Sequence, residues 1–155
     1  MAIAASLLPW FGKPKQAAEL VDQAVRLNPN YPEWYKMNML LGYFFAGEYE
    51  QALAATQSNL TPTMFDRVYR PLTYGQLGRE ADAATAAAEL LEIYPEYSAE
   101  RFLSDTGTFA REVELNRFLD GHPESGLPLC ATEAQLAKYP DMKRLEQCEQ
   151  QRASG

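Results

Sequence analysis

The sequence predicts an all-α protein: a right-handed superhelical array of about three helix-turn-helix repeats, followed by a non-repeating C-terminal helical cap. The main observation is a glycine that lies five residues before an alanine, a pair that occurs three times, at Gly12/Ala17, Gly47/Ala52 and Gly78/Ala83. The glycines are 35 and 31 residues apart, and Pro29, Pro62 and Pro95 follow at intervals of 33. A period of this length in an alanine-rich chain is typical of stacked helix hairpins.

Each column of this pattern has a physical reason. A glycine at the end of one helix supplies the positive φ that stops it and turns the chain. The alanine leaves room for the next helix to cross closely, and the proline ends that helix because it lacks an amide hydrogen. Leu8, Tyr43 and Tyr74 lie four residues before the glycines and are expected to fill the gap between the paired helices.

The first repeat, residues 1–31, pairs a short helix over 2–11 with a longer helix over 14–27. Apolar residues of the longer helix recur at helical spacing and form one stripe. They are Ala17, Leu20, Val21, Ala24 and Leu27. Pro14 suits the first turn of this helix, and the segment 28–32, rich in asparagine and proline, predicts its end.

The second and third repeats cover residues 32–62 and 63–95. We expect helices over 33–46 and 49–59 in the second repeat; the first of them is apolar on all sides and so predicted to be covered on all sides. In the third repeat, a helix from about Met64 to Tyr74 contains Pro71, which predicts a kink or one missing hydrogen bond. The alanine-rich stretch 79–94 gives the strongest helix prediction in the chain.

After Pro95 the period ends, and residues 96–155 are expected to form capping helices in the same domain. One helix is predicted to begin at Tyr97 or Ser98, and a second to be capped by Thr106 or Thr108. The segment 121–126 contains glycines and a proline and predicts a loop. A capping box over 132–135 predicts a short helix, and a last helix is expected from Pro140 toward Gln151.

Composition limits the classes of function. The 155 residues carry a net charge of −7 and the isoelectric point is about 4.8, which argues against nucleic acids and anionic membrane surfaces as partners. The sequence contains no stretch of about eighteen apolar residues, so it predicts no membrane-spanning helix. The chain begins with an apolar run that lacks a basic leader, and we therefore expect it to be a piece of a longer protein.

The columns resemble the tetratricopeptide repeat over roughly residues 2–95. The matching positions are Gly12, Ala17, Ala24 and Pro29 in the first copy, Tyr43, Gly47 and Ala52 in the second, and Tyr74, Gly78, Ala83 and Pro95 in the third. Leu40 and Pro71 depart from the pattern because they stand where the family has a small residue, and Asn59 replaces the usual alanine.

The resemblance implies a concave groove lined by the first helix of each repeat. In this register the groove side chains are Trp34, Met37, Leu41, Phe45, Phe65, Val68 and Leu72. Such a surface would accept an apolar peptide or helix. The alternative is that the chain's own C-terminal helices fill the groove, because an open apolar patch of this size is a liability.

We therefore expect a non-catalytic protein-interaction scaffold that binds a peptide or helix. Relatives that clamp a terminal carboxylate use polar groove residues, but Met37 and Leu41 stand at the clamp positions here, so clamping is not expected. More loosely, residues 31–54 and 126–130 resemble the repeat region that follows bacterial adenylate or guanylate cyclase-like sensor domains. That likeness implies the alternative function, a regulatory, sensory or self-association module of a larger bacterial signalling enzyme, in which a homo-oligomer would be the partner.

No residues predict catalysis, a metal or a cofactor. His122 is the only histidine and has no partners at metal-ligand or triad spacing. Cys130 and Cys148 are the only cysteines and could form a disulfide that pins the last helix. Their pairing bears on location: cytoplasmic is the default expectation, and a bonded pair would indicate the periplasm.

Overall fold

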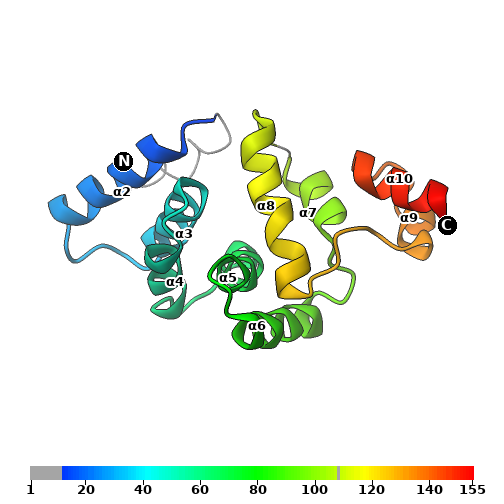
Figure 1. The fold of residues 1–155 in the computed structure, drawn as a ribbon. Helices are drawn as coiled ribbons and strands as arrows, with labels where there is room; N and C mark the ends of the chain where they lie inside the picture. Colours follow the sequence, from blue (N-terminus) through cyan, green and yellow to red (C-terminus); the bar gives the residue numbers. More distant parts are fainter. Residues whose placement is uncertain (1–11, 108) are drawn as a thin grey trace.

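The computed structural model describes residues 12–107 and 109–155, which form nine α-helices (Figure 1). Consecutive helices pack against each other from α2 to α6, and α8 packs across α5 and α6. The helices are α2 (Pro14–Leu27), α3 (Trp34–Ala46), α4 (Tyr49–Gln57), α5 (Met64–Gln76), α6 (Glu80–Ile93), α7 (Ala99–Thr106), α8 (Glu112–Ser125), α9 (Glu133–Lys138) and α10 (Glu146–Ser154). The helix expected over 2–11 lies outside the described residues.

The glycine, alanine and proline columns adopt the local structure expected of them. Gly12, Gly47 and Gly78 have φ of 72°, 83° and 69°. The paired alanines are fully buried in α2, α4 and α6; these are Ala17, Ala52 and Ala83. The three prolines lie in the connections that follow these helices. Each column therefore has the conformation or burial that its residue type requires, and the predicted bounds of α2 are confirmed.

Among the described helices, two begin with a capping box, and Ser98 caps a third, α7, by accepting from the backbone N–H of Arg101. Thr63 caps α5 through a capping box with Asp66, and Asp66 also accepts a hydrogen bond from the side chain of Asn59 at 2.8 Å. Thr132 and Gln135 form the capping box predicted for α9. Helix α5 continues through Pro71, so the carbonyl of Arg67 lacks its usual helical donor.

Three predictions in the C-terminal part are wrong. Helix α8 begins at Glu112 with Arg111 at its N-cap and is not capped by a threonine at 106 or 108. Residues 121–125 are the last turns of α8 rather than a loop, because Gly121 allows α8 to approach α5 closely: a Cβ at Gly121 would lie 3.1 Å from Cβ of Leu72. The helix expected from Pro140 begins only at Glu146. The preceding backbone is instead held by other partners, since Lys143 donates to Ser104 Oγ and Leu145 to Glu100, at 3.0 and 2.9 Å.

The core is built around aromatic rings from four helices and one loop. Tyr69 of α5 is fully buried and makes edge or tilted ring contacts with Phe44, Phe102 and Phe118 at centroid distances of 5.0, 6.3 and 5.6 Å. Phe109, which precedes α8, contacts Phe118 at 5.9 Å. These contacts join α3, α5, α7 and α8 into one hydrophobic core.

Helix α8 also buries the single histidine. His122 is fully buried; its Nδ1 donates to the carbonyl of Phe118 at 3.0 Å and its Nε2 accepts from the hydroxyl of Tyr97 at 2.8 Å. This arrangement satisfies a neutral imidazole at both nitrogens. Burial lowers the pKa of His122 to about 4, so the ring is uncharged at neutral pH.

The hydroxyl of Tyr69 provides a first prediction. It is buried and has no hydrogen-bond partner among the described residues. Tyr69→Phe removes this unpaired group at nearly constant shape, and we expect the free energy of unfolding to rise by about 1 kcal/mol, measured by urea denaturation. The control is Tyr97→Phe, which deletes a hydroxyl that does bond, to His122, and should lower stability by about 1 kcal/mol. Equal effects of the two changes would contradict this account.

The buried histidine makes stability depend on pH. The folded-state pKa of about 4 lies below the ordinary value of 6.5, so the unfolded chain binds the proton first as the pH falls. The stabilisation is therefore complete above pH 6.5 and is lost between 6.5 and 4, a loss on the order of 3 kcal/mol. In His122→Gln, the dependence of the unfolding free energy on pH should flatten within this window. An unchanged dependence in the variant would assign the effect to other groups.

Candidate functional site

Four of the seven side chains predicted to line a groove are buried in the core. They are Leu41, Phe45, Val68 and Leu72. The ring of Phe45 contacts Phe109 at 4.8 Å, and its carbonyl accepts a hydrogen bond from Arg117 of α8. Leu72 lies against Gly121 of the same helix. Helix α8 and the residue Phe109 before it therefore lie against two of these side chains, Phe45 and Leu72.

The other three predicted groove residues reach the surface. Trp34 is half exposed at the start of α3, whereas Met37 and Phe65 are partly buried. Trp34 packs edge-on against Tyr35 at 4.4 Å between centroids. Phe65 contacts Phe102 of α7 at 5.5 Å. The structure therefore divides the predicted set into a buried part and a smaller accessible part on the first turns of α3 and α5.

A second apolar feature follows the 33-residue spacing. Among the described residues, the exposed large hydrophobic side chains are Leu27 (67% exposed), Trp34 (50%), Leu60 (82%), Ile93 (49%) and Val113 (47%). Leu27, Leu60 and Ile93 are 33 residues apart, each two residues before a proline. We call Leu27, Trp34, Leu60 and Ile93 the apolar edge. The regular spacing of Leu27, Leu60 and Ile93 can be seen in the sequence. The amphipathic pattern of residues 14–27, however, led us to place Leu27 on the buried face of α2.

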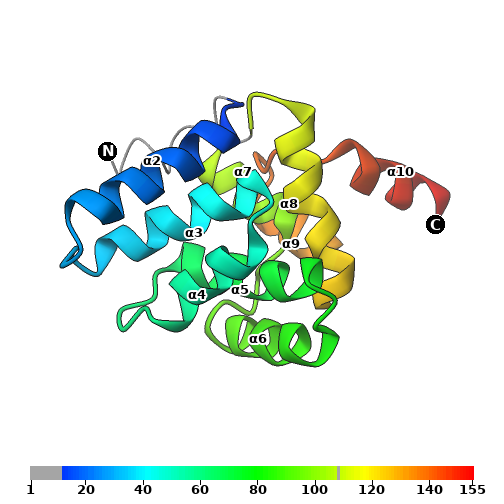
Figure 2. The same ribbon diagram turned by 60° about the vertical axis from the view of Figure 1, so that its left-hand side comes forward.

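Polar contacts hold two of the connections of the apolar edge together. The carboxylate of Glu33 accepts from the backbone N–H of Leu60 at 3.1 Å and from Lys36 at 2.8 Å. Lys36 also donates to the carbonyl of Ser58. The Lys36 ammonium and the Leu60 amide lower the pKa of Glu33. These bonds join the connections that follow α2 and α4. Figure 2 shows that these two connections and the one after α6 lie on the same side of the molecule.

The apolar edge ends at a pocket of about 380 Å³ between α5, α6 and α7. Its apolar lining comes from Met64, Ile93, Tyr94, Pro95, Tyr97 and Phe102. Three charged residues complete it: Glu96, Arg101 and Asp105. Ile93 belongs to both the apolar edge and the pocket. A largely apolar hollow with a few polar groups is the usual form of a binding pocket.

The charged groups of the pocket are already paired within the chain. Arg101 donates to Asp105 at 2.7 Å, and its guanidinium lies 3.7 Å from the ring centre of Tyr139. Glu96 accepts from Lys138 at 2.7 Å and from the hydroxyl of Tyr139 at 2.9 Å. The bonds from Lys138 and Tyr139 lower the pKa of Glu96. These charges therefore fix the position of the C-terminal segment beside the pocket.

A larger pocket, of about 560 Å³, lies beside α8 but has a polar lining. Its side chains include Arg111, Glu112, Arg117 and Asp120, and it contains one exposed aliphatic group, Val113.

Across the described residues, no group of histidine, cysteine, aspartate or glutamate is arranged to hold a metal ion. None of the helices described there has the length and apolar character to cross a membrane.

Comparisons with known proteins identify no family. No protein-family model, curated protein or solved structure matches the chain. The assignment of a function therefore depends on the apolar edge and the pocket themselves.

Proposed function

We propose that the chain is a non-catalytic protein-interaction module of the tetratricopeptide type, and that a helix of its partner binds along the apolar edge. The repeat type is supported by the three turn glycines with positive φ and by the three fully buried alanines that follow them. The observation that carries the binding role is the regular spacing of Leu27, Leu60 and Ile93 beside an apolar pocket. Exposed apolar patches of this kind mark interaction sites.

The spacing of the edge also limits the geometry of the partner. Leu27, Leu60 and Ile93 lie at or just after the ends of alternate helices, α2, α4 and α6, so a partner must be long enough to span the ends of three hairpins. An amphipathic helix gathers its apolar residues on one face and would place that face against these side chains. The net charge of −7 favours a partner whose flanking residues are basic.

The disulfide between Cys130 and Cys148 is formed, and we propose an oxidising compartment such as the periplasm on that basis. The second candidate function is self-association along the apolar edge, as in a regulatory module of a larger signalling enzyme. The experiment below distinguishes self-association from the binding of a partner helix.

A displayed library of random 20-residue peptides, selected on the immobilised protein, provides the test. We expect selected peptides to share apolar residues at the spacing of one face of a helix, three and four positions apart. A Leu27→Ser/Leu60→Ser/Ile93→Ser variant should bind such a peptide more weakly by about tenfold or more, measured by fluorescence anisotropy. Because these side chains are exposed, the variant should keep its thermal unfolding midpoint.

The control variant is Val113→Ser, which removes an equally exposed aliphatic group from α8 and should leave affinity unchanged. A Trp34→Ala/Phe65→Ala variant tests the accessible part of the predicted groove. Loss of binding in this variant alone would place the peptide in the groove and contradict the edge. A concentration-dependent dimer in sedimentation that disappears in the triple variant would favour self-association.

A further inference from the structure

The segment 130–155, here called the C-terminal cover, packs on α7 and has almost no core of its own. Its separate hydrophobic cluster consists of Ala131, Leu136 and Met142, with Tyr139 beside it. A hydrophobic cluster of three buried side chains is too small to keep a segment of this size folded independently. Its position must therefore depend on attachments to the rest of the chain.

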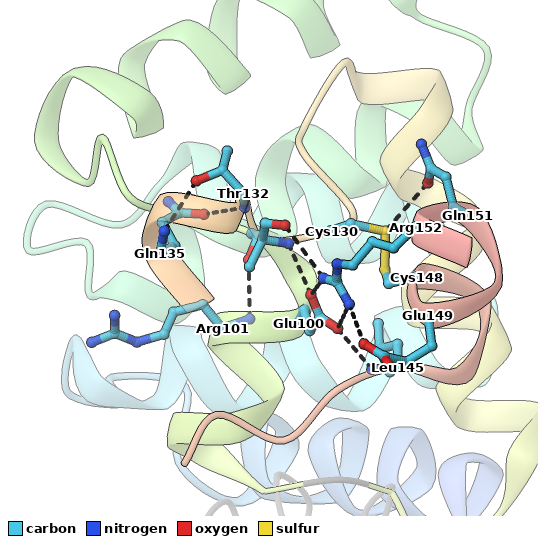
Figure 3. The surroundings of a disulfide bond; sticks show 12 residues. Glu100, Arg101, Cys130, Thr132, Gln135, Leu145, Cys148, Glu149, Gln151 and Arg152 are labelled. Atoms are coloured by element: carbon cyan, nitrogen blue, oxygen red, sulfur yellow. Dashed lines mark hydrogen bonds and ion pairs between the residues drawn. A yellow bond between two sulfur atoms is a disulfide. The ribbon is translucent and has the colours of Figure 1, made fainter. Parts of the chain in front are cut away.

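One attachment is a buried carboxylate on α7. Glu100 is fully buried and accepts hydrogen bonds from the backbone N–H groups of Ala131 and Leu145, both at 2.9 Å. Arg152 of α10 forms an ion pair with the same carboxylate and also donates to the carbonyl of Ala131 at 3.3 Å. These groups converge on Glu100 from three parts of the cover (Figure 3).

Within the part of the chain that the structure describes, the hydrogen-bond partners of the Glu100 side chain all belong to the cover. Release of the cover would therefore bring the carboxylate into water and would not leave it buried without a partner. A charge that loses its partner and stays buried destabilises the fold. A carboxylate that becomes exposed to water is solvated instead, so this destabilisation does not arise. The contact can consequently open as one unit.

A second constraint is covalent and lies within the cover itself. The disulfide between Cys130 and Cys148 closes a loop that contains α9 and the first turn of α10. Cys148 is fully buried, whereas Cys130 is partly exposed. The covalent link keeps Ala131 and Leu145 close together, because each lies one or three residues from a bonded cysteine. In this way the disulfide holds together the two backbone donors that Glu100 requires.

We propose that the disulfide makes the packing of the C-terminal cover on α7 sensitive to redox conditions, and that its reduction releases the cover from α7. A thiolate of a dithiol reductant attacks Sγ of Cys130 and displaces the Cys148 thiolate, which takes up a proton. The second thiolate of the reductant then attacks the mixed disulfide and releases Cys130 as a thiol. Two electrons pass to the protein, and the reductant becomes a disulfide.

Release would change the face that α7 presents to solvent. Glu96 would lose Lys138 and Tyr139, Arg101 would lose Tyr139, and Ser104 would lose the amide of Lys143. Glu96 and Arg101 also line the apolar pocket. An effect on partner binding at that pocket rests on the proposed function, whereas the release itself does not.

Hydrogen–deuterium exchange of the backbone amides tests the release without any partner. Samples are the oxidised chain, the chain reduced with dithiothreitol, and a Cys130→Ser/Cys148→Ser variant. In the last two, the amides of Ala131 and Leu145 should exchange about a hundredfold faster, since closure of a loop of this length shifts the opening equilibrium by about that factor. Amides of α5 should exchange at the oxidised rate, which shows that the main core stays folded.

Unchanged exchange of Ala131 and Leu145 after reduction would overturn the proposal, as would simultaneous loss of protection in α5. The matched control is oxidised Arg152→Met, which removes the ion pair to Glu100 and keeps the disulfide. A smaller effect than that of reduction is expected. If this variant frees both amides as fully as reduction does, the ion pair and not the disulfide fastens the cover, and the proposal is wrong.

Discussion

The close crossing of α8 over α5 is the contact on which the rest of the structure depends. It is possible only because both helices carry glycine where they meet: a Cβ at Gly75 would lie 3.0 Å from Cβ of Glu124, and a Cβ at Gly121 would lie 3.1 Å from Cβ of Leu72. Contacts at that separation require the neighbours to shift. The crossing brings Phe118 against Tyr69 and so joins the C-terminal helices to the hairpins.

The same crossing decides which apolar surface remains accessible. Helix α8 and the residues before it cover Phe45 and Leu72, so a partner cannot reach these side chains in this structure. The exposed apolar side chains lie instead where the outer helices end, at Leu27, Leu60 and Ile93. These three residues share one place in the 33-residue spacing, two residues before a proline, at or just after the ends of α2, α4 and α6. The apolar edge is therefore a consequence of the period, whereas the covered face is a consequence of the unrepeated tail.

The sequence predicted what local rules determine. Gly47 and Gly78 need positive φ, Ala52 and Ala83 need close packing, and the chain satisfies each within its own hairpin. Prediction failed where tertiary contacts overrode local signals. The stretch from Gly121 contains turn-forming residues, yet it is helical because the glycine serves the approach to α5. Pro140 does not start a helix because Glu100, forty residues earlier, holds the following backbone at Leu145.

The candidate site shows the same division. The period of Leu27, Leu60 and Ile93 could be read in the sequence, but their exposure could not, because it depends on what packs beside each helix end. The environment of Glu100 is further from prediction, since its partners Ala131, Leu145 and Arg152 come from three separate segments. A buried carboxylate is stable only while such partners surround it. The C-terminal cover is therefore held on α7 mainly by polar contacts, of which those to Glu100 are the most buried, and its own disulfide keeps two of the Glu100 partners, Ala131 and Leu145, close together.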